Sequence, residues 1–331
     1  MTQQPAAAKT FHLLEATIAD IQAAYAAKSL SARELVQLYL QRIEAYDRGG
    51  PNINSVITLS PTALDDADKL DAAHRASGPV GPLHGIPVLL KDQIDSQGMP
   101  TTLGSVVFRD YFPDRDAFLV EQLKKAGAII MGKVTLGEMG GGDTHGSLFG
   151  STRNPYDLDR TVGGSSGGPA ASVAANFCTV AVGQEAFASI RRPSAWNSTV
   201  GIRPTAGLVS RSGVYAGWPA VNASLGPMTR NVQDLAITLD VLAGYDPEDP
   251  ITALGVGQTP GSYTEFLDAR GLQGARIGVL RESMGAGSEP ESEDFAKVSG
   301  VFDKAVAEIQ AAGATVIDPI TIPKLTELLA K

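Results

Sequence analysis

The chain has 331 residues, of which 43% are hydrophobic and 19% are charged, so it can bury a substantial interior and is not a disordered protein. Its 27 basic and 36 acidic residues give a formal net charge of −9, and no run of lysine or arginine is long enough to follow a phosphate backbone. Direct nucleic-acid binding is therefore disfavoured. Cys178 is the only cysteine, which excludes an internal disulfide and a cysteine-rich zinc site.

Neither a signal peptide nor a membrane span is predicted. Residues 1–10 lack an apolar segment, and no later window reaches the apolar length that a bilayer requires. We expect a disordered tail over residues 1–10, one large domain over residues 11–331, and a cytoplasmic protein without membrane contact. The final IPKLTELLAK resembles the start of another secondary-structure element. Two interpretations stay open: the chain is cut short at its C-terminus, or it finishes in a docked helix.

The first half of the chain predicts helices followed by a buried strand. Amphipathic patterns predict helices over residues 17–27 and 31–46, and Ser31 with Glu34 forms the sequence signature of a capping box. A third helix begins at Ser60-Pro61 and ends before Gly78. The apolar run at residues 86–90 has the length of a buried strand and places Lys91 at its carboxyl end.

Helices and strands then alternate, which is typical of a parallel sheet. Further helices are predicted for residues 116–126, for the small-residue stretch after 163–168, for 231–243 with Asn231 as N-cap, and for 293–312. Further strands are predicted for residues 128–131, 178–182, 276–280 and 315–317.

The glycine-rich GGSSGG at residues 163–168 has two interpretations that fail on details of this sequence. A phosphate-binding loop requires a lysine that GGSSGG lacks, and the nearest match, GAIIMGKV at residues 127–134, lacks the final serine or threonine. A nucleophile elbow centred on Ser166 requires a preceding buried strand and a later histidine. Residues 154–160 are instead polar loop sequence, and no histidine follows Ser166.

A third interpretation uses lysine as the base. Five blocks, GPLHGIPVLLKD, FGSTRNPYDLDRTVGGSSGG, SIRRPS, IRPTAGLVS and GPMTRNVQD, resemble the amidase signature family of serine hydrolases, in family order, over roughly residues 18–249. The resemblance implies a single α/β/α domain with a mixed, mostly parallel central sheet covered by helices. It also implies catalysis without a metal or an organic cofactor.

The same resemblance assigns the catalytic groups. It makes Lys91 the base, Ser165 the bridging serine of a cis peptide and Ser189 the nucleophile, with Gly163, Gly164 and Ser166 in supporting places. A neutral lysine can accept a proton that passes from one serine to the next. Each residue taken alone has a commoner explanation. A lysine is usually snorkelling or salt-bridged, and a serine beside glycine or proline usually serves a turn or a helix cap.

The segment before Ser189 departs from the family pattern. Ala186, Phe187 and Ala188 stand where family members usually have glycines whose backbone N–H groups form an oxyanion hole, so either the loop reaches that geometry without positive φ or the hole is distorted. We also expect Phe187 to narrow the acyl pocket.

Four further residues complete the predicted site and its surroundings. Glu185 and Arg191 are expected to brace the nucleophile loop, with a surface ion pair as the alternative. Met139 and Gly140 are expected to line the substrate site, with core packing as an equal alternative for Met139.

The predicted function is hydrolysis of a carboxamide or related acyl C–N bond through an acyl-enzyme. The expected partner is a small-molecule amide, and a homodimer stays open. Two alternatives remain: the glutaminase-type component of an aminoacyl-tRNA amidotransferase, which works in a complex, and a catalytically weak member with a binding role. His84 and His145 lack clustered partners and are interpreted as structural rather than metal ligands.

Overall fold

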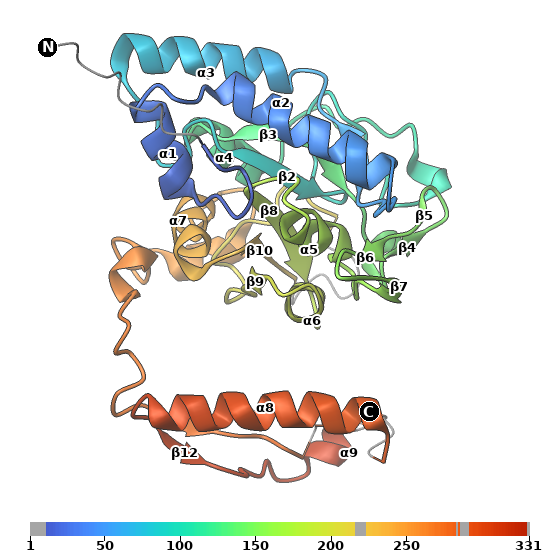
Figure 1. Ribbon diagram of the computed structural model, residues 1–331, viewed down its shortest axis with the longest axis vertical. Coiled ribbons are helices and arrows are strands. Elements are labelled where there is room, and N and C mark those ends of the chain that lie inside the picture. The colour runs from blue at the N-terminus through green and yellow to red at the C-terminus, as the bar shows by residue number, and fades with distance from the viewer. Residues whose placement is uncertain (1–10, 216–222, 283, 285–290, 330–331) are drawn as a thin grey trace, which may run out of the picture. The chain divides into compact units, whose positions relative to one another are not determined.

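The computed structural model describes residues 11–215, 223–282, 284 and 291–329 (Figure 1). It divides the chain into two compact units, Met1–Glu265 and Phe266–Lys331. The predicted tail at residues 1–10 lies outside the described residues. The single domain over residues 11–331 stays a prediction, and each unit is described on its own.

A six-stranded mixed sheet forms the centre of the first unit, with strand order β1-β3-β2-β8-β10-β9. The middle strands β3, β2 and β8 are parallel to one another, whereas β1 and β10 run antiparallel to them and β9 runs antiparallel to β10. Four of the six strands therefore point the same way. Their bounds are β1 (Val56–Leu59), β2 (Pro87–Lys91), β3 (Ile129–Val134), β8 (Val180–Glu185), β9 (Val200–Gly201) and β10 (Ser224–Thr229).

Helices pack against this sheet. Helices α3 and α4 contact β3, α5 crosses β2, β8 and β10, and α7 contacts β10. The helices of this unit are α1 (Ile18–Ala26), α2 (Ala32–Arg42), α3 (Ala63–Ser77), α4 (Phe118–Lys125), α5 (Gly167–Ala174), α6 (Arg191–Trp196) and α7 (Val232–Leu242). Strands β2, β3 and β8 are buried along their whole length, which explains why they appear in the sequence as continuous apolar runs.

Local capping signals correctly predicted where several helices begin and end. Ser31 and Glu34 form the expected reciprocal capping box of α2, and Thr17 with Asp20 forms another at α1. Helix α3 ends at Gly78, whose φ of 85° lies in the region that favours glycine.

Several strands were not predicted. Strands β1 and β9 are short, and β10 contains Gly226 and Pro227, which normally interrupt a strand. Gly226 is required there because a Cβ atom would lie 2.0 Å from the Ile202 carbonyl oxygen. A polar loop was expected over residues 154–160, but most of this stretch belongs to the hairpin of β6 (Arg153–Asn154) and β7 (Asp157–Thr161). Every residue of β7 is exposed, so the sequence lacks the alternation of buried and exposed residues by which a strand is predicted.

Shorter elements complete the first unit. They are η1 (Ile43–Arg48), η2 (Val106–Phe108), η3 (Glu138–Gly140), β4 (His145–Gly146), β5 (Gly150–Ser151) and η5 (Pro250–Gly255), and η6 (Tyr263–Phe266) follows at the boundary between the units.

The second unit is a small β-α-β arrangement. Strands β11 (Arg276–Gly278) and β12 (Thr315–Ile317) form a parallel pair, joined by helix α8 (Glu293–Ala311), and α9 (Leu325–Leu329) follows. Strands β11 and β12 and helix α8 agree in type with the sequence prediction, and α9 lies in the stretch where the start of another element was expected. No helix in the described part of the chain is long and apolar enough to cross a membrane.

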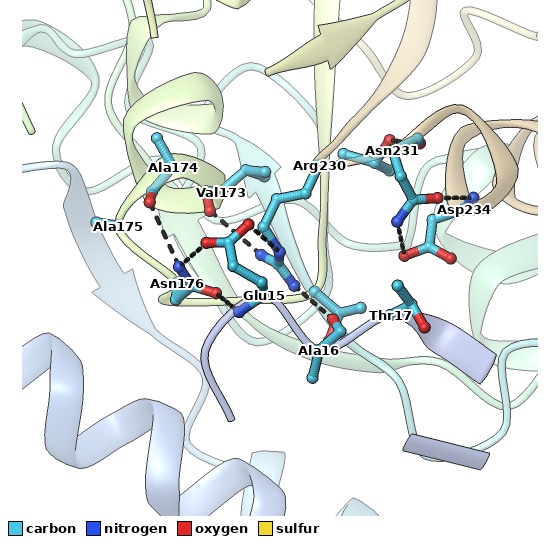
Figure 2. Close-up of polar contacts among 12 residues, drawn as sticks. Glu15, Ala16, Thr17, Val173, Ala174, Ala175, Asn176, Arg230, Asn231 and Asp234 are labelled. Atoms are coloured by element: carbon cyan, nitrogen blue, oxygen red, sulfur yellow. Dashed lines mark hydrogen bonds and ion pairs between the residues drawn. The ribbon is translucent and has the colours of Figure 1, made fainter. Parts of the chain in front are cut away.

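Arg230, which follows β10, and Asp234 on α7 hold the start of α1 and the residue Ala16 before it (Figure 2). The Arg230 guanidinium donates hydrogen bonds to the carbonyl oxygens of Ala16, Val173 and Cys178 at 2.8, 3.2 and 2.8 Å. The Asp234 carboxylate accepts from the Ile18 backbone N–H group at 3.2 and 3.3 Å. Residues distant in sequence thereby fix the N-terminal segment.

Candidate active site

Lys91 ends β2 inside the protein, with none of its surface exposed. Its Nζ atom lies 2.8 Å from Ser165 Oγ and 3.1 Å from the Gln184 carbonyl oxygen, both uncharged groups. No described carboxylate lies within ion-pair distance of it, in contrast to Lys133 on the neighbouring strand. Lys91 is therefore neither a snorkelling nor a salt-bridged lysine.

Burial lowers the pKa of Lys91 well below its usual range, and the negative charge of Glu185 opposes this shift only in part. A neutral amine carries a lone pair, so it can accept the hydroxyl proton of Ser165 while it donates to the Gln184 carbonyl. The contact between Lys91 and Ser165 thus has the geometry that a lysine base requires.

The GGSSGG loop brings Ser165 to Lys91. The Gly164–Ser165 peptide is cis, as the family resemblance implied. The Ser165 carbonyl accepts from the Gly137 N–H group at 3.0 Å, and the Gly163 carbonyl accepts from the Thr144 N–H and hydroxyl groups at 3.0 and 2.8 Å. Thr144 was not predicted from the sequence, because its role depends on a contact between distant segments.

Ser166 is fully buried and serves the loop itself. Its hydroxyl donates to the Gln184 carbonyl at 3.1 Å and accepts from the Gln184 N–H group at 3.3 Å. Its own N–H group donates to the Ser189 carbonyl at 3.0 Å. A serine bonded in this way joins two loops and is poorly placed to be the nucleophile of an elbow.

Ser189 lies half-buried in the turn between β8 and α6, and the bond from Ser166 places this turn beside the GGSSGG loop. Among the described residues its hydroxyl forms no hydrogen bond. The structure therefore brings Lys91 and Ser165 into direct contact and bonds the backbone of Ser189 to that of Ser166, the neighbour of Ser165. The proton transfer between Ser189 and Ser165 stays a proposal.

Glu185 holds the turn that carries Ser189. Its fully buried carboxylate accepts from the backbone N–H groups of Ile190 and Arg191 at 2.8 and 2.9 Å and from Arg191 Nε at 2.7 Å. Arg191 also donates to the Phe187 carbonyl at 2.6 Å. Because Glu185 is buried, this interaction is not the weak surface ion pair that formed the alternative.

The segment Ala186-Phe187-Ala188 follows β8 without any residue at positive φ, so its backbone is one that these residues adopt readily. The Phe187 side chain is 82% exposed. Met139 and Gly140 have φ values of 53° and 84°, and Met139 is 42% exposed, so it does not serve as core packing.

Arg192 is a second residue that sequence reasoning missed. Its Nε atom donates to the Gly164 carbonyl at 3.2 Å, and its NH2 group donates to the Gly142 carbonyl at 3.2 Å and to Asp143 Oδ1 at 2.7 Å. The guanidinium lies over the Trp196 ring, 5.3 Å from the centroid. Helix α6 is thereby connected to the carbonyl of the cis peptide, and the consecutive arginines of SIRRPS were the only signal for it.

A buried ion pair lies next to Lys91 in sequence. Lys133 on β3 lies 3.1 Å from Asp92 and donates to the Pro100 carbonyl and the Thr101 hydroxyl at 3.2 and 3.1 Å. The GAIIMGKV stretch is mostly strand β3, in line with the strand predicted for residues 128–131, and it does not form a phosphate-binding loop.

The histidines occupy structural positions. His84 is 2% exposed, accepts from the Val80 N–H group at 3.2 Å and stacks on His74 with ring centroids 5.2 Å apart. His145 Nδ1 lies 2.8 Å from Ser151 Oγ. Within the described residues no group of three or more His, Cys, Asp or Glu side chains could hold a metal ion.

A mixed sheet with a buried lysine and a cis-serine loop at its strand ends defines an α/β protein of the amidase-signature fold. The family model described as Amidase matches residues 34–331, and the chain belongs to this family.

Proteins similar to the chain include amidotransferase subunits and amidases. The A component of glutamyl-tRNA(Gln) amidotransferase from Alkaliphilus metalliredigens (strain QYMF) is 38% identical over 312 residues, which are 93% of this chain and 60% of the relative. The native peptide amidase of Stenotrophomonas maltophilia aligns with a TM-score of 0.86 at 39% identity, over 97% of this chain and 65% of that chain. A bacterial aryl acylamidase aligns with a TM-score of 0.81 at 29% identity, over 96% and 63%. The chain thus spans about 60% of the length of the relatives it matches.

Proposed function

We propose that the protein is an amidase that hydrolyses a carboxamide or related acyl C–N bond, with Ser189 as nucleophile, Ser165 as bridge and Lys91 as base. The observation that carries this proposal is the fully buried Lys91 amine, 2.8 Å from Ser165 Oγ and without a carboxylate partner among the described residues. Family membership supports the same reaction class.

In the proposed reaction, Ser189 Oγ forms a bond to the substrate carbonyl carbon as its proton passes to Ser165 and the proton of Ser165 passes to Lys91. Breaking the C–N bond returns a proton through Ser165 to the leaving nitrogen, and an ester on Ser189 remains. Water then attacks the ester with the same proton transfers, which releases the acid and restores Ser189. Each proton transfer in this scheme runs through Ser189, Ser165 and Lys91.

The residues around the nucleophile are proposed to stabilise this reaction. Backbone N–H groups of Ala186, Phe187 and Ala188 would face the developing oxyanion, and Met139 and Gly140 would line the substrate site. Glu185 and Arg191 would hold the turn of Ser189 in place through the contacts described above. Gly163, Gly164 and Ser166 would hold the cis peptide beside Lys91.

A second candidate is a glutaminase-type component that works in a complex. The glutamyl-tRNA(Gln) amidotransferase relatives, at 38% identity, favour it. A catalytically weak member with a binding role is supported only by the Ala186-Phe187-Ala188 segment. A cytoplasmic location, a small-molecule substrate and a homodimer stay predictions.

A panel of aliphatic amides, aryl amides, peptide amides and glutamine, with hydroxylamine as acceptor, tests the proposal. We expect hydroxamate from at least one amide, and none from Ser189→Ala or Lys91→Ala. Turnover of glutamine alone among the panel would favour the second candidate. Unchanged turnover in either variant would refute the site assignment.

A further inference from the structure

A cavity of about 400 Å³ lies beside the segment that follows β2, and none of the residues assigned above to the reaction lines it. We name it the Asp95 pocket. Its lining consists of Asp95, Thr101, Leu103, Phe108, Tyr111, Gly213, Val214 and Tyr215. The backbone of Asp95 is fixed on both sides, since its N–H group donates to the Gly213 carbonyl at 2.9 Å and its carbonyl accepts from Ala117 at 3.0 Å.

The lining of the pocket carries a negative charge, that of Asp95, which buried groups neutralise only in part. Among the described residues, one buried ammonium, that of Lys133, lies 3.1 Å from Asp92 and 3.1 Å from the Thr101 hydroxyl, and its charge also acts on Asp95. Arg115, the next cation, is engaged by Glu248 at 2.8 and 2.6 Å. Two carboxylates and one ammonium leave one net negative charge when both acids are ionised.

Burial raises the pKa of Asp95, and the Thr101 hydroxyl and the charge of Lys133 oppose that shift. The carboxylate is therefore less well solvated than a surface acid. A cation bound against it would recover part of the lost solvation energy, and a neutral ligand would not.

Three aromatic rings form the walls around this charge. Tyr111 is 51% exposed and Tyr215 46% exposed, and Phe108 is half-buried. Aromatic faces attract cations through their quadrupole, and alkylammonium groups are bound in proteins by rings of this kind together with an acid. An exposed apolar patch that surrounds a cavity marks a binding site more often than chance.

We propose that the Asp95 pocket binds a small organic cation, an ammonium or guanidinium group on an apolar or aromatic body, with the charge at Asp95 and the body against Tyr111, Tyr215 and Phe108. A metal ion fits less well, because the pocket offers one carboxylate and its walls are rings. The proposal goes beyond the amidase reaction and does not depend on it, since binding is measured without an amide substrate.

Calorimetric titration with benzylammonium, and with benzyl alcohol as a neutral probe of similar size, tests the proposal at low salt. We expect benzylammonium to bind at least about tenfold more tightly than benzyl alcohol, because the alcohol gains no charge interaction. Asp95→Asn should remove this preference. Asp159→Asn, which changes an exposed acid on β7, is the matched control and should retain it.

Two further measurements keep the test decisive if Asp95→Asn does not fold. Tyr111→Leu should weaken benzylammonium binding by about threefold or more, because it removes a ring face but keeps apolar contact. In the wild type, benzylammonium binding should weaken as the pH falls through the raised pKa of Asp95, while benzyl alcohol binding stays constant. Equal binding of the two probes by the wild type, or full benzylammonium affinity in Asp95→Asn, would overturn the proposal.

Discussion

Replacing Lys91 with methionine keeps most of the side-chain volume but removes the amine that contacts Ser165 and Gln184 at 2.8 and 3.1 Å. The variant loses the only group proposed to accept the proton of Ser165. General-base catalysis contributes about 10²–10⁴-fold to rates, so we expect kcat to fall by at least that factor. Because the partners of Lys91 are a hydroxyl and a carbonyl, no buried carboxylate is left unpaired.

The same substitution has a predicted effect on the free energy of unfolding. The pKa of Lys91 is lowered in the folded protein, whereas in the unfolded chain it is about 10.4. Between these two values the unfolded state binds one proton more, so acid favours unfolding and the free energy of unfolding rises with pH, by up to about 1.4 kcal/mol per unit. Lys91→Met lacks this contribution and should be as stable as the wild type or more so at pH 7.

Urea unfolding of both proteins between about pH 6 and pH 9, beside amide turnover, measures both effects. Lys133→Met is the matched control, since it also removes a buried lysine but leaves Asp92 without its partner at 3.1 Å. That variant should lose about 3–5 kcal/mol. Equal pH slopes for Lys91→Met and the wild type, or retained turnover in Lys91→Met, would refute the reasoning.

Substitutions at four further positions distinguish residues that support the site from residues that support the fold. Glu185→Ala leaves two backbone N–H groups without their acceptor, so urea unfolding should show a loss of about 3 kcal/mol and turnover should be abolished. Arg192→Met should lower kcat by about tenfold or more with little change in KM, and Arg192→Lys should restore part of it, because the contact to the Gly164 carbonyl positions Ser165. Arg230→Met removes the donor to three carbonyls, so the free energy of unfolding should fall by about 3 kcal/mol while kcat at low temperature is unchanged. Phe187→Ala changes an 82% exposed side chain, so the free energy of unfolding should stay within about 0.5 kcal/mol of the wild type. We expect kcat/KM for bulky amides to rise relative to kcat/KM for acetamide. An unchanged ratio of these two values would contradict a role of Phe187 in the acyl pocket.

The elements with local signals were predictable from the sequence. The capping box of Ser31 and Glu34 and the glycine at residue 78 mark helix ends through interactions within a few residues. Strand β10 lacks such a signal, because Gly226 and Pro227 are accepted only through pairing with β8 and the close approach of Ile202. Its existence depends on tertiary contacts that no local pattern contains.

The candidate site also contains residues that the sequence indicated and residues that it did not. Sequence blocks indicated Lys91 and Ser165, and the structure places their side chains in contact. Arg192 and Thr144 could not be predicted, since their carbonyl partners lie in loops distant in sequence. The environment of Lys91 could not be predicted either, because whether a carboxylate reaches ion-pair distance of its amine depends on how distant segments pack around β2, and among the described residues none does.

Measuring the protonation state of Lys91 tests the proposed lysine base most directly. Carbon-13 NMR of the labelled lysine side chains, with Lys91→Met to assign the signal, reports the protonation of each amine as the pH changes. We expect the Lys91 amine to titrate well below the usual range of a lysine and, as the proposed base, to be neutral in the folded protein near pH 7. A Lys91 signal that remains that of an ammonium group up to about pH 10 would contradict it.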